Sequence, residues 1–253
     1  MVDVIRKVAE RAGQSVGDIQ AAIRQSPVVH ADETGWREHG VNGYVWTFST
    51  LTQRYFVRGG RNKEVVDEVL GAEFGGVLVS DFYAAYHHYL GVHQRCWAHL
   101  LRDIHDLKVV YPADHSLADW AAVVLELYRE GVSFERSEQR CRLVKQQDLE
   151  NRLLVACQPF VADPLAVQGK LCRRIERHIK ELFVFVGNLA VPPTNNAAER
   201  SLRHLVTSRK IGGGTQSGSG TTSKMVLSSL FGSWLAQGRN PLTECYALLQ
   251  SPY

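Results

Sequence analysis

Long hydrophobic runs are missing from this chain of 253 residues. No stretch of about 18 apolar residues occurs, so the sequence predicts no membrane-spanning helix. Residues 1–13, MVDVIRKVAERAG, lack the apolar segment of a signal peptide, and nothing in them marks the protein for export. With 45% hydrophobic and 22% charged residues, the composition is that of an ordinary soluble globular protein.

Cysteine motifs and phosphate-loop motifs are lacking as well. The five cysteines are an odd number without any CxxC pair, which favours reduced thiols in a cytoplasmic protein. The glycine-rich stretch GGGTQSGSG lacks the GK[ST] ending of a Walker sequence. His93, Cys96 and His99 are evenly spaced, but no second ligand pair of the usual zinc spacing accompanies them, so zinc is disfavoured.

Charge is balanced overall but unevenly distributed. The net charge is only +3, whereas residues 199–240 carry six basic residues against a single acidic one. The same stretch is rich in Gly, Ser and Thr, a composition that suits a phosphate-bearing partner. The alternative is a solvated basic surface without a partner.

The order of strand-like and helix-like segments indicates an α/β protein. Aromatic and β-branched residues mark three strands separated by short turns, which favours an antiparallel meander. Helices and short apolar strands then alternate, which predicts a mixed sheet with helices on its faces. The expected strands cover residues 27–32, 43–50, 53–60, 75–81 and 91–97, and the expected helices cover 62–71, 82–90 and 98–107.

Helical periodicity without alternating stretches marks much of the remaining chain. It covers residues 1–25 and again 114–187, so the second block is interpreted as an all-helical insertion into the α/β chain. Residues 208–223 are expected to form a flexible polar loop before two final helices. The predicted organisation is a helical lead (1–27), a first part of the core (28–109), the insertion (110–190) and a second part of the core (191–253).

Three carboxylates stand at positions where the chain leaves or enters an element. Asp32 is expected near the end of the first strand, Asp81 directly after the strand GGVLVSD, and Glu199 in the first turn of a helix. Carboxylates that converge repel one another unless cations hold them. Mg²⁺ prefers oxygen ligands, and two such ions about 4 Å apart can cut or join phosphodiesters.

Each carboxylate also has a structural explanation. Asp32 could begin an Asp-Glu-Thr-Gly turn, and Asp81 could cap the helix that follows it. Glu199 follows Asn196 by three residues, which resembles a capping box. Spacing by itself does not decide between capping and catalysis.

The residues around these carboxylates resemble transposases of the insertion-sequence 66 family, of the DDE type. The resemblance rests on four motifs that occur in order over most of the chain: HADETGW, VLVSDFYAAY, CWAHLLRD and NNAAERSLR followed by SRKIGGG. It implies a ribonuclease-H-like fold, a metal triad of Asp32, Asp81 and Glu199, and DNA cleavage with strand transfer. It also implies two Mg²⁺ ions, with Mn²⁺ as a substitute.

The resemblance carries further expectations about partners and supporting residues. The partner is double-stranded DNA, as transposon ends and target, bound by a homodimer or larger assembly in the bacterial cytoplasm, at the nucleoid. His99 and Arg102 share a helical face and are expected to approach the scissile phosphate or steady a carboxylate. The basic residues expected at DNA phosphates are Arg200, Arg203, Arg209, Lys210 and Lys224.

Two departures from the family keep other functions open. Relatives usually carry an N-terminal extension for DNA recognition, whereas only residues 1–27 precede the first expected strand here. Phe82 stands where the family usually has Gly, so the turn after Asp81 is expected to differ. The alternatives are a ribonuclease-H-like nuclease that cuts without joining, and an inactive or repurposed transposon-derived protein that only binds DNA or a partner.

Overall fold

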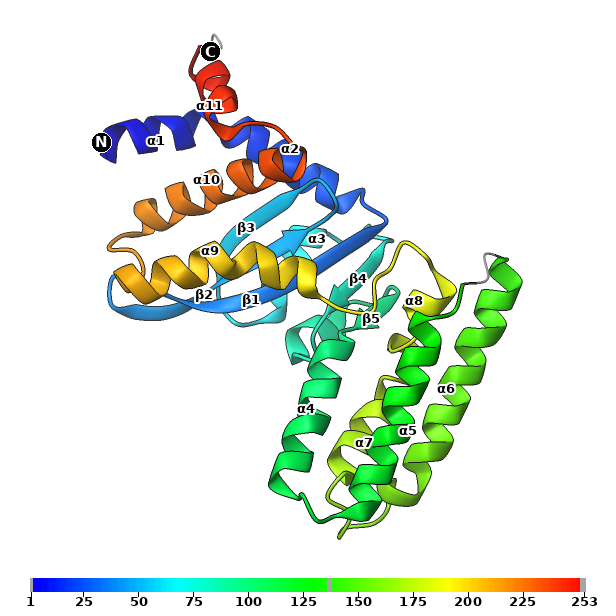
Figure 1. Cartoon of the computed structure of the whole chain (residues 1–253). Coiled ribbons are helices and arrows are strands. Elements are labelled where there is room, and N and C mark those ends of the chain that lie inside the picture. Colours follow the sequence, from blue (N-terminus) through cyan, green and yellow to red (C-terminus); the bar gives the residue numbers. More distant parts are fainter. Residues whose placement is uncertain (1, 136–137, 251–253) are drawn as a thin grey trace. The chain divides into compact units, whose positions relative to one another are not determined.

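A computed structural model of the chain describes residues 2–135 and 138–250. Its strands form a five-stranded mixed sheet in the order β3-β2-β1-β4-β5, with helices beside it (Figure 1). The α/β class predicted from the order of segments is confirmed. The chain divides into two compact units. The first comprises residues 1–78, 83–91 and 196–253, and the second comprises 79–82 and 92–195, so the division falls within β4.

Strands β1 (Val28–Glu38), β2 (Val41–Ser49) and β3 (Arg54–Gly59) form the predicted antiparallel meander. β1 is longer than expected, because residues up to Glu38 continue to pair with β2. The two strands are joined by His39 and Gly40, whose φ angles of 48° and 78° suit a tight hairpin turn. Asp32 therefore lies within β1, so the prediction that it stands near the strand's end is wrong, and residues 32–35 are strand rather than the alternative Asp-Glu-Thr-Gly turn.

The meander is covered on both faces by helices of its own unit. One face carries Trp36, Val45 and Phe56, which pack against residues of α9 (Asn196–Gly212) and α10 (Gly218–Ala236). The opposite face carries Val29, Ala31, Trp46 and Phe48 and packs against α2 (Gly13–Arg24), α3 (Lys63–Leu70) and the 3₁₀ helix η1 (Ala84–His88). In place of the longer helix expected at 82–90 there is only this short 3₁₀ helix.

The N- and C-terminal helices pack together in the first unit. α1 (Val2–Arg11) and α2 confirm the expected helical start, and α11 (Pro241–Gln250) follows α10. Ala12 and Ile19 form an apolar cluster with Leu230 and Trp234 of α10.

The segment 208–223, expected to be a flexible loop, is largely helical. α9 continues to Gly212, and α10 already begins at Gly218, where the Ser217 hydroxyl caps it by accepting from the Gly220 N–H at 3.1 Å. The turn between them is fixed to the end of β1 by backbone hydrogen bonds of Thr215 with Arg37 and His39. Gly214 has φ +121°, and a Cβ there would lie 2.0 Å from the Arg37 carbonyl oxygen. Gly214 thus permits a close approach to the protein's own strand.

The second unit is mainly helical. It holds the end of β4 (Val77–Ser80), β5 (His93–Arg95) and α4 (Trp97–Val110), and then a series of helices. That series consists of α5 (His115–Val132), α6 (Gln139–Val161), α7 (Gly169–Arg177), the 3₁₀ helix η2 (Ile179–Glu181) and α8 (Val184–Gly187). Its apolar centre includes Trp97, whose ring lies 5.1 Å from that of Phe183.

The proposed division into a core and an insertion remains a prediction. Within it, residues 1, 136–137 and 251–253 lie outside the described part of the chain. Among the helices that are described, none is both long and apolar enough to cross a membrane.

Candidate functional site

Asp32 lies on the face of the sheet that α9 covers. Its register partner on β2 is Thr47, whose own partner on β3 is Phe56, so these three residues share one face. Phe56 packs with Leu202 and Leu205 of α9 in a common apolar cluster. The half-buried Asp32 carboxylate accepts the N–H of Glu33 at 2.9 Å through Oδ1.

Two polar contacts fix α9 along β1 and β2. The Ser49 hydroxyl, opposite His30 in the register, donates to the Ser201 hydroxyl at 3.1 Å. Eight residues further along the helix, Arg209 donates to the Thr34 hydroxyl at 3.1 Å and to the Gly35 carbonyl. About 12 Å of helix thus matches about 13 Å of strand, so α9 runs alongside β1 in the same direction.

Glu199 stands at the beginning of this docked helix. It precedes Ser201 by two residues, about 3 Å of helix rise, while Asp32 follows His30 by about 7 Å of strand. One oxygen of the Glu199 carboxylate is buried. α9 begins at Asn196, which makes Glu199 the fourth helical residue, whereas a capping box places its Glu third. The first unit therefore holds Asp32 on the sheet face that α9 covers, and Glu199 in the first turn of α9 itself.

Asp81 belongs to the second unit and directly follows β4, as predicted. Its carbonyl oxygen accepts from Arg95 Nη1 at 2.7 Å, and Arg95 is only 1% exposed. The same guanidinium donates from Nε to Glu181 at 2.5 Å. Ser80, the residue before Asp81, is hydrogen-bonded to the His93 ring at 2.8 Å. The main chain at Asp81 is thus held by a buried polar network.

Glu181 is the anion of this network. Burial by itself would raise the pKa of its carboxyl group, but a hydrogen bond to His178 and the positive charge of Arg95 lower the pKa to about 2. The His178 ring nitrogen lies 3.2 Å from Glu181, and that of His93 lies 3.9 Å from it. The buried Arg95 charge is therefore paired at neutral pH, as a buried guanidinium requires.

Phe82 is the residue at which the sequence departs from the expected family pattern. Among the described residues, His39 is the only non-glycine residue with a positive φ, so the backbone of Phe82 is ordinary. Its ring packs edge-on against His178 at 5.7 Å, and the Arg174 guanidinium lies 4.4 Å from the ring centre. The side chain that replaces glycine thus anchors the residue after Asp81 to α7.

His99 and Arg102 both lie on α4, with His99 half-buried and Arg102 exposed. His93 and Cys96, which share the regular spacing of His99, make polar contacts within the second unit. The His93 ring bonds to Ser80, and the Cys96 thiol accepts the Asn195 N–H at 3.1 Å. The role of His99 and Arg102 at a phosphate remains a prediction.

The five basic residues expected at DNA fall into two groups. Arg200, Arg203 and Lys210 are exposed on α9. Arg209 instead bonds to β1, and Lys224 donates to the Ser208 hydroxyl at 2.5 Å and lies 5.4 Å from the Trp36 ring. The last two side chains are used in joining α9 and α10 to the sheet.

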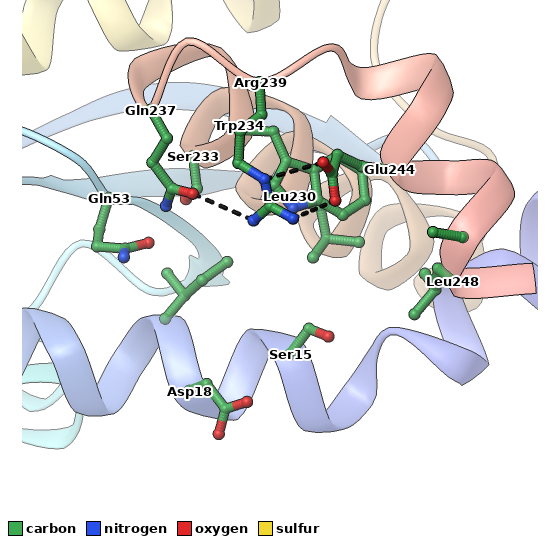
Figure 2. A pocket seen from close by; sticks show the side chains of 12 residues that line it. Ser15, Asp18, Gln53, Leu230, Ser233, Trp234, Gln237, Arg239, Glu244 and Leu248 are labelled. Atoms are coloured by element: carbon green, nitrogen blue, oxygen red, sulfur yellow. Dashed lines mark hydrogen bonds and ion pairs between the residues drawn. The ribbon is translucent and has the colours of Figure 1, made fainter. Parts of the chain in front are cut away.

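Two cavities of the first unit differ in their charge. One, of about 380 Å³, lies beside α2, α10 and α11 (Figure 2). Its Arg239 is neutralised by Glu244, with an N–O distance of 2.9 Å. The other, of about 350 Å³, lies beside α9, and its walls include Arg54, Arg200 and His204 without any carboxylate.

The family comparison covers most of the chain. The family model described as Transposase IS66 family matches residues 1–223. The chain belongs to this transposase family. The match confirms the resemblance inferred from the four motifs, and membership implies DNA as a partner of this transposase. Neither the curated proteins nor the solved structures yielded a match.

Three residues with roles in these features, Arg95, Glu181 and Arg54, were not predicted from the sequence. Arg95 and Glu181 are separated by 86 positions, and only the position of an arginine within the short apolar strand 91–97 hinted at a buried charge. A buried arginine needs an acidic partner, but the sequence does not say which one. Arg54 was missed because it begins an ordinary strand.

Proposed function

We propose that this chain is the catalytic part of a DDE transposase, in which Asp32, Asp81 and Glu199 bind two Mg²⁺ ions and DNA is cleaved and joined. The observation that carries the proposal is the docking of the Glu199 helix on the sheet face that bears Asp32, in a member of a transposase family. Asp81 enters through its motif and its place directly after β4, which neighbours β1 in the sheet.

The donor set suits the proposed ions. All three side chains offer carboxylate oxygens, which Mg²⁺ and Mn²⁺ prefer over nitrogen or sulfur ligands. Asp32 and Glu199 are offset by about 10 Å along β1, a span that their side chains and ions about 4 Å apart can bridge. Two such ions, when bound, would activate the attacking oxygen and stabilise the leaving one.

The protein's own residues supply position and charge. The contacts of Ser201 and Arg209 fix α9, and Arg95 fixes the main chain at Asp81, so within each unit the backbone that carries these carboxylates is held in place. The exposed Arg200, Arg203 and Lys210 would hold phosphates of the DNA backbone beside Glu199. The proposed fold is ribonuclease-H-like, supported by the meander of β1–β3 with β4 next to β1.

The test uses the full chain and DNA bearing the transposon ends, with uncut ends for cleavage and pre-cut ends plus a target duplex for joining. We expect Mg²⁺-dependent cleavage and joined products, both lost in Asp32→Asn, Asp81→Asn and Glu199→Gln while DNA binding persists. Cleavage without joining would instead identify a nuclease. Undiminished activity in any of the three variants would remove that residue from the site.

A further inference from the structure

The cavity beside α9 is built from three elements of the first unit. β3 contributes Arg54 and Phe56, one face of α9 contributes Arg200, Ser201 and His204, and the end of α10 closes it with small and apolar residues. Arg200 and His204 are one helical turn apart and so share a face. No acidic residue lines this cavity, in contrast to the cavity in Figure 2, where Glu244 pairs with Arg239.

Its positive charges act on one another. Arg54 donates to the Gln53 carbonyl at 2.7 Å and to the Thr50 carbonyl, which holds its guanidinium in place. Burial lowers the pKa of Arg54, and the positive charge of Arg200 lowers it further. Like charges that face one cavity without a counterion destabilise each other, and an anion between them would remove that cost.

His204 adds a third donor that can become charged. Its Nδ1 lies 2.9 Å from the Ser201 carbonyl oxygen, and its Nε2 lies 3.1 Å from the Ser228 hydroxyl. Burial lowers the pKa of this imidazole, the bond to Ser201 opposes that change, and Lys224 lowers the pKa further. An anion bound in the cavity would favour the protonated ring.

We propose that Arg54, Arg200 and His204 form a phosphate subsite that holds one backbone phosphodiester of the bound DNA. The subsite rests on the proposed function for its ligand and adds Arg54 and His204 to the DNA-binding residues. Arginine suits it, because its planar fork binds phosphate oxygens in pairs.

The location places this phosphate at a useful distance from the carboxylates. Arg200 adjoins Glu199 in sequence, and Phe56 lies in the same cross-strand row as Asp32, two strands away. Two strand spacings are about 10 Å, which corresponds to roughly three phosphates along the axis of one DNA strand. The subsite would therefore hold the strand near the point of cleavage without touching the reacting phosphate.

The first experiment needs neither metal nor DNA. Inorganic phosphate is titrated into the full chain while NMR follows the pH titration of the His204 ring. We expect phosphate to raise the midpoint by about one pH unit, because an anion within a few ångströms favours the charged ring. Arg200→Gln should abolish the rise, whereas Arg203→Gln, which removes an exposed arginine of the same helix outside the cavity, should keep it. No rise in the parent protein, or equal losses in both variants, would overturn the subsite.

The second experiment measures binding of duplex DNA in a double-mutant cycle. Arg200→Gln should weaken binding about tenfold in the parent but much less in Arg54→Gln, because both arginines hold the same phosphate. Arg203→Gln should have the same effect in both backgrounds. Additive effects for Arg54 and Arg200 would contradict a shared phosphate. Arg54→Lys, which keeps the charge but loses the fork, serves as the second variant in case Arg54→Gln disturbs the 50–53 turn.

The outcomes separate the subsite from the proposed function. Coupled arginines in a protein without Mg²⁺-dependent cleavage would leave the phosphate subsite standing and remove the transposase chemistry. Metal-dependent cleavage with uncoupled arginines would support the transposase chemistry and remove the phosphate subsite.

Discussion

Asp32 and Glu33 are neighbours in sequence but face opposite sides of the sheet. Asp32 shares its face with Thr47 and the docked helix α9, whereas Glu33 points to the other core. There the Glu33 carboxylate accepts from the Tyr86 hydroxyl at 2.8 Å and from Arg61 at 3.0 Å, and its side chain is 3% exposed. Two adjacent acids are thus divided between a candidate reaction site and the fold.

This division predicts opposite effects for two conservative substitutions. Asp32→Asn should abolish Mg²⁺-dependent cleavage and change the free energy of unfolding by less than about 1 kcal/mol, since a half-buried side chain keeps its shape. Glu33→Gln should cost about 1–3 kcal/mol, because a buried charge-assisted network loses its anion, but the folded variant should still cleave. Cleavage assays and urea denaturation on both variants provide the check. A cleaving Asp32→Asn would remove Asp32 from the site.

The acid stability of the chain should depend on Glu181. Its pKa in the folded protein is about 2, below the ordinary value of 4.5, so its contribution is complete above about pH 4.5 and is lost as the pH falls towards 2. The full contribution is at most about 3 kcal/mol. Glu181→Gln should lower stability at pH 7 and reduce the difference between pH 7 and pH 3, as measured by urea denaturation.

Glu130 offers a matched control for this titration. Hydrogen bonds from Arg152 and Lys145 also lower the pKa of Glu130, but these cations are 44% and 19% exposed, whereas Arg95 is 1% exposed. Screening makes such exposed ion pairs weak, so Glu130→Gln should alter the pH dependence far less than Glu181→Gln. Equal effects of the two variants would mean that Arg95 and Glu181 are not a buried pair.

Two glycines at the α9–α10 turn should respond differently to substitution by alanine, according to their backbone conformation and the space around them. Gly214→Ala should cost more than about 2 kcal/mol, because its φ is +121° and a Cβ would meet the Arg37 carbonyl. Gly212→Ala should change stability by less than about 1 kcal/mol, since nothing lies within 4 Å of the added carbon. Thermal denaturation distinguishes the two. A loss of DNA binding in a stable Gly212→Ala would instead indicate close backbone approach to DNA.

The part of the fold that follows from local patterns could be predicted from the sequence. The meander is rich in aromatic and β-branched residues, the strand before Asp81 is a short apolar run, and the terminal helices have helical spacing; the structure has all of them. The extension of β1 past Asp32 was missed, because Gly35 and Arg37 look unlike strand residues and pair only because β2 returns beside them. The helical ends at Gly212 and Gly218 were missed because glycine normally opposes helix, and the Ser217 cap and the contact with β1 outweigh that preference here.

The candidate site was predictable only where a motif marked it. The three carboxylates could be named because each stands in a recognisable motif, although whether they bind metal remains a prediction. Arg54, in the cavity beside α9, and the pair of Arg95 and Glu181, in the second unit, carry no motif, because the cavity and the pair each bring together residues far apart in sequence. The periodicity of a sequence does not reveal which distant residues meet in the folded chain.

The salt dependence of DNA binding should separate exposed cations from those used in the fold. Arg203→Ala with Lys210→Ala should flatten the slope of log K against log salt by roughly two, at about 0.9 per lost phosphate contact. Affinity should fall about equally for different DNA sequences, because phosphates carry no base information. Both side chains are exposed on α9, so the folded state should be unaffected.

Arg209→Ala should behave differently, although Arg209 is next to Lys210. Its guanidinium bonds to Thr34 and Gly35 of β1, so removing it should cost about 1–3 kcal/mol of stability and free the end of α9. Its effect on the salt slope should be small, since the charge is already engaged within the protein. Binding titrations from low to high salt, combined with urea denaturation, give both quantities for each variant. A full unit of slope lost in a stable Arg209→Ala would show that this arginine leaves β1 and binds a phosphate.

For the Arg203 and Lys210 double variant, an unchanged slope would mean that the exposed face of α9 is only a solvated surface.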